Sequence, residues 1–365
     1  MIWTQDVGGT LIVEEKEVTS VHPPTKRNLI SLPSTAQMTA MKPALLTAVA
    51  RIPVLAIALW PMAGARADHG PGTSGGGAST QSAETLRPGR FSFELKEDYT
   101  EFQHLPQAEI NAKAVNAGGI DILDRSFIET VGLAYGIVEN FQAGISIGYY
   151  HAVGAGSTEY DAGTAVFDTA TSDPDGVTDL WLSAKYRFYR GPLGQLAVFG
   201  GVKFPTGRHV VSDSNGAPLE PSATAGSGSF DGMLGLAFSR FLTSRLTVDA
   251  SAQYTFRTEH GGFRLGDRID GGAALAYRFT GDIQSFPQVG VFAEANVRHL
   301  SKSEDGGVSD PNTGGTALFL TPGIRVGINR NLSVTFGAPL PVVQDLNGEQ
   351  LKTGFKVTGA LNVGF

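Results

Sequence analysis

The chain has 365 residues, a formal net charge of −7 and no cysteine. A disulfide scaffold and cysteine-ligated zinc or iron–sulfur sites are therefore excluded, and an acidic chain lacks the basic surface that nucleic-acid binding requires. Hydrophobic residues make up 41% of the sequence, and 47 glycines indicate many turns. We predict no cofactor and no nucleic-acid partner.

The first informative segment is an apolar run at residues 52–62, IPVLAIALWPM, which follows Lys42 and Arg51. It is shorter than the roughly 18–20 residues that a membrane-spanning helix needs. The small residues of Ala65-Arg66-Ala67 follow it, and this order is typical of a secretory signal. We predict a signal peptide over residues 41–67, cleaved between Ala67 and Asp68, and we interpret residues 1–40 as an over-long N-terminal extension. A buried helix of a soluble domain is the alternative.

Residues 68–89 are rich in glycine, serine and threonine and have no apolar periodicity. Such a composition is typical of a flexible segment. We predict a disordered periplasmic lead here, with a plug inside a barrel lumen as the alternative.

Strict alternation begins further along the chain and is clearest over Leu180–Phe188. Leucine, alanine and aromatic residues occupy one face, and Asp179, Lys185 and Arg187 belong to the other. A period of two indicates a β-strand, and a length of about ten residues suits a strand that crosses a bilayer at a tilt. With Leu196–Phe204, this segment is predicted to form a transmembrane hairpin, apolar toward lipid and polar toward a lumen.

The same pattern recurs along residues 90–365, and the connections alternate between short turns and long, polar loops. Twelve strands are predicted, over residues 90–102, 127–134, 141–150, 180–188, 196–204, 233–241, 246–256, 269–279, 289–299, 318–328, 332–339 and 352–365. An even number of strands with this asymmetry is typical of outer-membrane barrels. The predicted fold class is all-β, an antiparallel up-and-down transmembrane barrel with short periplasmic turns and long extracellular loops. The terminal aromatic Phe365 resembles the signal by which such barrels are recognised by their assembly machinery.

The alternation also predicts which ionisable residues face the lumen. They carry both signs, so they form either a selective polar pore or a salt-bridge network that fills the lumen. The candidates are Glu94, Lys96, Asp98, Asp179, Lys185, Arg187, Lys203, Asp249, Asp270, Arg278, Glu294, Arg298, Arg325 and Lys356.

Five histidines fall at or just beyond the predicted strand ends on the side of the long loops: His104, His151, His209, His260 and His299. Imidazole binds metals and titrates near neutral pH, so a metal-binding or pH-sensing ring is one interpretation. Polar residues at an extracellular rim are the other. We predict no catalytic and no metal-binding residue.

Several short motifs appear in a characteristic order. Gly176-Val177-Thr178-Asp179 opens a strand that ends in Lys185-Tyr186-Arg187, and Lys203-Phe204-Pro205-Thr206-Gly207 ends the next one. Four more motifs follow in the second half: residues 226–231 (GSGSFD), residues 265–267 (LGD), residues 321–325 (TPGIR) and the Gly-x-Pro-x-Pro of residues 337–341. In this order the motifs resemble the meta-pathway of phenol degradation family of predicted outer-membrane transporters, over roughly residues 90–365. The resemblance implies uptake of small, often apolar compounds.

We therefore predict an outer-membrane channel for passive uptake of small molecules, aromatic or apolar compounds among them, and not an enzyme. The expected location is the outer membrane of a Gram-negative bacterium, reached through the periplasm. Expected partners are outer-membrane lipid and lipopolysaccharide, the barrel-assembly machinery and a small-molecule solute. The alternatives are a structural or partner-binding barrel and, third, an outer-membrane lipid hydrolase.

Overall fold

The computed structural model describes residues 77–280, 282 and 285–365. The predicted extension, the signal peptide and the cleavage site between Ala67 and Asp68 lie outside these residues, as do residues 68–76 of the predicted lead. No helix in the described part of the chain is long and apolar enough to cross a bilayer.

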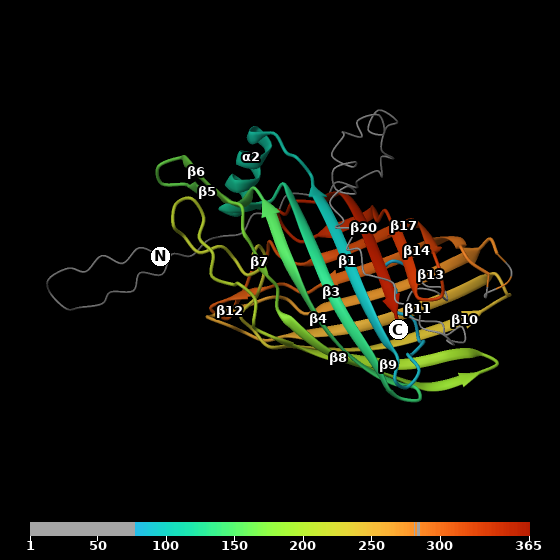
Figure 1. Cartoon of the computed structure of the whole chain (residues 1–365). Helices are drawn as coiled ribbons and strands as arrows, with labels where there is room; N and C mark the ends of the chain where they lie inside the picture. Colours follow the sequence, from blue (N-terminus) through green and yellow to red (C-terminus); the bar gives the residue numbers. More distant parts are fainter. Residues whose placement is uncertain (1–76, 281, 283–284) are drawn as a thin grey trace. The chain divides into compact units, whose positions relative to one another are not determined.

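Long antiparallel strands lie side by side and form the wall of a barrel (Figure 1). The main sheet has 14 strands in 12 wall positions, because β7 shares the position of β8, and β19 shares that of β18. The strands are β1 (Phe91–Phe102), β3 (Arg125–Val138), β4 (Phe141–Val153), β7 (Asp175–Val177), β8 (Leu180–Gly191), β9 (Gly194–Phe204), β10 (Asp231–Phe241), β11 (Leu246–Arg257), β13 (Arg268–Arg278), β14 (Gln288–Leu300), β17 (Gly315–Gly327), β18 (Leu332–Gly337), β19 (Leu340–Leu346) and β20 (Thr353–Gly364).

The first and last strands close the ring. Strand β1 pairs with β20 over its length, from Ser92 opposite Gly364 to Phe102 opposite Thr353. Closure removes the free edges that an open sheet would expose to lipid. The predicted twelve-stranded antiparallel barrel, the fold of outer-membrane proteins, is confirmed.

The side chains of the wall separate by parity. On β8, Leu182, Tyr186 and Phe188 are 43–51% exposed on the outer surface. On the same hairpin, Asp179 and Lys203 are buried on the inner side. This is the arrangement that a lipid-facing barrel requires.

The long loops contain structure that the sequence pattern did not predict. The predicted plain loops are corrected to helix α2 (Gln107–Ala117) and two small sheets. In the first sheet, β5 (Ala155–Asp161) lies between β2 (Gly119–Ile122) and β6 (Val166–Ser172), and in the second, β15 (Glu304–Asp305) lies between β12 (Phe263–Arg264) and β16 (Val308–Ser309). Helix α2 and strands β5 and β6 lie beyond the same end of the long strands (Figure 1). Helix α2 has no pronounced apolar face, and β5 and β6 are rich in polar residues, so apolar periodicity could not reveal them.

The predicted strand at residues 332–339 is also corrected. It divides into β18 and β19, and the second part continues to Leu346. Both parts pair with β17, on the side opposite to β14.

Candidate functional site

The described part of the N-terminal segment, residues 77–88, is bonded to side chains of the inner wall. The carboxylate of Glu294, on β14, accepts hydrogen bonds from the backbone N–H of Ala78 at 2.8 Å and of Thr80 at 2.5 Å. The Thr80 hydroxyl donates to the same carboxylate. Glu294 is only 3% exposed, so the segment supplies the donors that a buried carboxylate requires.

The rest of the segment reaches other strands. Backbone N–H groups of the segment donate to Ser251 on β11, Ser239 on β10 and Gln142 on β4, at 2.8–3.0 Å. These acceptors lie on three different strands, none of which is β14. The segment therefore crosses the inside of the barrel.

Cationic side chains complement the carbonyl groups of the same segment. Lys185 donates to the Ser82 carbonyl at 2.8 Å, and Arg325 donates to the Gly77 carbonyl at 3.0 Å. A Cβ atom at Gly77 would overlap the Glu294 carboxylate, so a larger residue at that position would require this carboxylate to shift away from the segment. The wall thus binds N–H groups with an anion and carbonyl groups with cations.

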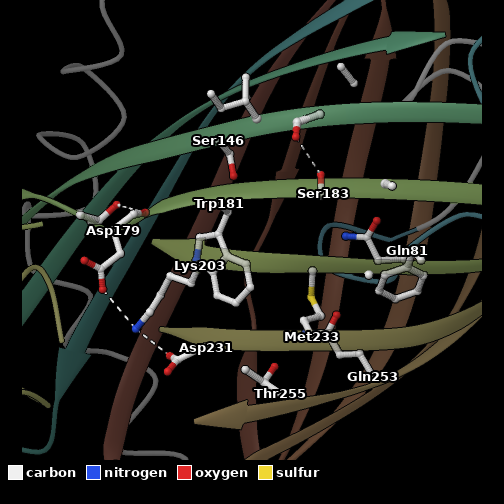
Figure 2. A pocket seen from close by; sticks show the side chains of 18 of the residues that line it. Gln81, Ser146, Asp179, Trp181, Ser183, Lys203, Asp231, Met233, Gln253 and Thr255 are labelled. Carbon is white, nitrogen blue, oxygen red and sulfur yellow. Dashed lines mark hydrogen bonds and ion pairs between the residues drawn. The ribbon is translucent and has the colours of Figure 1, made fainter. Parts of the chain in front are cut away.

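A cavity of about 740 Å³ lies beside the segment, and Figure 2 shows part of its lining. Trp181 of β8, Phe199 of β9 and Met233 of β10 contribute its apolar surface. Glycine on neighbouring strands makes room for them: a Cβ at Gly235 would overlap the Phe199 ring, and one at Gly201 would lie 3.2 Å from the Met233 methyl group. An aromatic surface in a polar cavity is suited to small aromatic molecules.

One buried cation joins two strands at the loop side of this cavity. Lys203 Nζ lies 2.6 Å from an Asp231 oxygen and 3.1 Å from an Asp179 oxygen, and it also donates to the Ser227 hydroxyl. Asp179 accepts three further hydrogen bonds, from the backbone N–H of Gly207 and from the backbone N–H and hydroxyl of Ser227. The bonds to Gly207 and Ser227 fix the loop between β9 and β10 against the wall. Figure 2 shows Lys203 with Asp179 and Asp231.

A second cavity, of about 520 Å³, is lined by ionisable residues and by residues 77–82 of the segment. Asp270 on β13 pairs with Arg268 at 2.6 Å and with Arg298 at 2.8 Å. Lys96 pairs with Asp98 at 2.9 Å. The lumen therefore contains ion pairs and open volume together.

The structure distributes the predicted lumen residues over these features. Eight of them line the second cavity: Glu94, Lys96, Asp98, Lys185, Asp270, Arg298, Arg325 and Lys356. Asp179 and Lys203 line the first cavity, and Asp249 bonds to Ser239 beneath the segment. Arg187 and Arg278 lie at the short-turn end, where they bond to Asn140 and to the Ser244 carbonyl.

Sequence reasoning missed three contributors. Trp181 has the inward parity of Asp179 but was not recognised, because only ionisable residues were selected. Arg268 shares the parity of Asp270, but the predicted strand began one residue too late. Gln142 binds the segment through a contact that no periodicity encodes.

The five predicted rim histidines do not converge. The rings of His209 and His260 lie 5.1 Å apart, whereas His151 stacks on Phe127 and His299 bonds to Thr316. His104 is exposed beyond the end of β1. His151 lies within β4, because that strand extends further than predicted, and His299 lies in β14, one residue before the strand ends. In the described part of the chain, no three histidines or carboxylates are arranged to hold a metal ion.

Phe365 lies next to the first strand. Its backbone N–H donates to the Phe91 carbonyl at 3.0 Å, and the two rings are 6.4 Å apart.

Comparison with solved structures finds outer-membrane barrels. An outer membrane channel from Pseudomonas putida F1 is 13% identical, with a TM-score of 0.51 over 78% of this chain and 98% of that one. The NanC porin is 9% identical, with a TM-score of 0.40 over 75% of this chain and 98% of the other. The CymD monoaromatic hydrocarbon channel is 8% identical, with a TM-score of 0.36 over 77% and 89%. At these identities the likeness is one of fold. None of the curated proteins matches the chain.

The sequence profile of one family, described as putative MetA-pathway of phenol degradation, matches residues 114–342. The match includes the motifs from Gly176 to Pro341 and confirms the resemblance stated above. The chain belongs to this family.

Proposed function

We propose that the protein is an outer-membrane channel that takes up small aromatic molecules. The observation that carries the proposal is the cavity of about 740 Å³ beside Trp181, inside a closed barrel with an apolar outer surface. A cavity of this size has ample room for a single-ring compound. Trp181, Phe199 and Met233 supply apolar contacts, while the surrounding polar groups keep water in the unoccupied lumen.

The family description and the names of the barrel's structural relatives agree with this proposal. The barrel would lie in the outer membrane of a Gram-negative bacterium, with its aromatic and aliphatic outer face in contact with lipid. Its partners would be that lipid, the lipopolysaccharide of the outer leaflet, and the assembly machinery that recognises Phe365.

Residues 77–88 would act as a resident plug in this channel. Their hydrogen bonds to Glu294, Ser251, Ser239 and Gln142 span the lumen, so a solute that moves along the axis must pass or displace them. The cavities on either side of the plug would hold solute and water.

Tryptophan fluorescence tests the proposal directly. The sequence contains three tryptophans, at positions 3, 60 and 181. In the full chain carrying Trp3→Phe and Trp60→Phe, Trp181 alone reports on the cavity. We expect 4-nitrophenol to quench its emission saturably, whereas arabinose leaves the emission unchanged.

A matched measurement links binding to passage. Refolded protein in a planar bilayer should conduct KCl, and 4-nitrophenol should reduce that conductance over the same concentration range as it quenches. Linear, unsaturable quenching together with no conductance would overturn the proposed function.

A further inference from the structure

The wall of the barrel has a discontinuity between β19 and β20. Strand β18 pairs with β20 from Leu332 opposite Val363 to Gly337 opposite Thr358. Strand β19 pairs only with β17. Among the described residues, which include this whole region, no backbone ladder joins β19 to β20.

The Gly-x-Pro-x-Pro motif explains why the ladder stops. Pro339 and Pro341 have no N–H to donate, and proline within a sheet is found at free strand edges. Ala338 lies between Gly337 and Pro339, and its N–H donates to the Pro322 carbonyl on β17. An irregular register beside Phe319 also places Val342 outside the regular pairing. The motif therefore turns β19 toward β17 and away from β20.

The side chain of Gln344 marks one end of the discontinuity, opposite to the end at Gly337. The Gln344 amide donates to the Thr353 carbonyl at 2.9 Å and accepts from the Thr353 N–H at 2.7 Å. A side chain here occupies the place of the backbone ladder, which holds strands about 4.8 Å apart. We define the wall gap as residues 338–343 of one strand and 354–357 of the other, between this contact and the Gly337–Thr358 pair.

The wall gap has an apolar outer side. Leu340 and Val343 lie opposite the outward-facing Leu320 and Leu318, and each is 46% exposed. The neighbouring wall carries three contacting rings, those of Phe355 on β20, Tyr99 on β1 and Phe127 on β3. Aromatic rings of this kind mark the level of the membrane interface in barrels.

Its inner side borders the second cavity. Phe319, Pro339, Lys356 and Ala360 all line that cavity. The Lys356 ammonium lies 5.5 Å from the centre of the Phe319 ring, across the position that β19 would fill if it were paired. This contact spans the lumen side of the wall gap, so a molecule that enters from the lumen separates the two side chains and meets an aromatic face and a cation as it does so.

We propose that the wall gap is a lateral portal through which small aromatic molecules move between the second cavity and the surrounding lipid. Unpaired strand edges are disfavoured against hydrocarbon, so the portal is retained against a physical cost. Along the axis, residues 77–88 obstruct the lumen, and residues 77–82 of this segment line the same cavity. The side route leads past Phe319 to Leu340 without displacing them. This inference rests on the proposed function, because it specifies the path of the same solutes.

The test closes the portal by restoring the missing donors. In the full chain, P339V/P341V gives β19 two N–H groups with which to pair with β20. Hydrogen exchange of residues 340–346 in detergent reports whether the ladder forms, and P192V, in the turn between β8 and β9, is the control. Should the double variant fail to fold, as shown by loss of heat-modifiable migration on gels, L340W obstructs the outer opening instead.

Toluene uptake by cells and KCl conductance in bilayers are then measured for each variant. We expect portal closure to lower toluene uptake at least fivefold and leave the conductance unchanged, while P192V changes neither. The portal is overturned if toluene uptake stays equal to that of the unaltered chain in P339V/P341V, once hydrogen exchange shows β19 to be newly protected, or in L340W. If the unaltered chain neither conducts nor raises toluene uptake above that of cells lacking it, the proposed function itself fails.

Discussion

Thr80 and Glu294 lie 214 residues apart in the chain, and the Thr80 N–H and hydroxyl both donate to one carboxylate oxygen at 2.5 Å. A carboxylate offers only acceptors, which is what a cluster of donors requires. We predict that Glu294→Gln weakens the plug, because the glutamine NH₂ group opposes the N–H groups of the segment. The mean KCl conductance in planar bilayers should rise severalfold.

The matched control for this prediction is Glu304→Gln, which removes a carboxylate from the small sheet of β12, β15 and β16, away from the segment. It should leave the conductance unchanged. An identical rise in both variants would show that net charge, and not the contact with Thr80, sets the conductance.

Lys203→Met should destabilise the barrel strongly. The substitution leaves the buried Asp179 and Asp231 carboxylates without their shared cation, and breaking a buried ion pair costs about 3–5 kcal/mol. Urea unfolding followed by Trp181 emission measures the effect. Lys302→Met, at an exposed position, should unfold at the urea concentration of the unaltered chain. Equal midpoints for both variants would contradict a stabilising role for Lys203.

Gly235→Ala should reduce binding of aromatic molecules. An added Cβ would overlap the Phe199 ring and lie 2.8 Å from the Ala252 carbonyl, so the ring must move into the cavity. We expect severalfold weaker quenching of Trp181 by 4-nitrophenol, and a loss of about 1–3 kcal/mol in stability from overpacking. Gly132→Ala is the control, because its Cβ would meet its neighbours at 3.8 Å. Unaltered quenching in Gly235→Ala would exclude Phe199 from the binding surface.

The folded conformation of the loop that contains Glu220 should become less stable as pH rises. Burial raises the pKa of Glu220 to about 7, the negative charges of Asp121 and Asp310 add to this effect, and the Ser222 hydroxyl opposes it. The folded loop therefore binds more protons than the unfolded chain between the ordinary glutamate pKa and about 7, so its stability falls across that window.

Hydrogen exchange of residues 211–224, corrected for intrinsic rates, should show greater protection at about pH 5 than at about pH 8. Glu220→Gln should remove most of this difference. Equal pH dependence in the variant would assign the effect to other groups.

The wall could be predicted from the sequence because its constraint is local. Every second side chain from Leu180 to Phe188 must suit lipid, and the strand pattern follows from that requirement alone. The lumen residues followed by parity, and Arg268 was missed only because a strand end was misplaced. The open cavity beside Trp181 depends on glycines of other strands, which a single strand does not reveal.

Contacts between distant segments could not be predicted in this way. The bonds from residues 77–88 join a segment without periodicity to Glu294, Ser239 and Gln142, which are far away in sequence. Helix α2 buries only Ala114 and has no apolar face to reveal it. The strand predicted over residues 332–339 stopped where β19 begins, because the renewed pairing of β19 with β17 depends on the fold.

The pairing of β20 has a consequence for assembly. This strand is bonded to β1 along its whole length but to β18 only as far as Thr358. The pairing of β1 with β20, which closes the barrel, can therefore form before β19 pairs with β17. Movement of β19 relative to β20 need not break the pairing of β1 with β20. The barrel can therefore stay closed while its wall changes between β19 and β20.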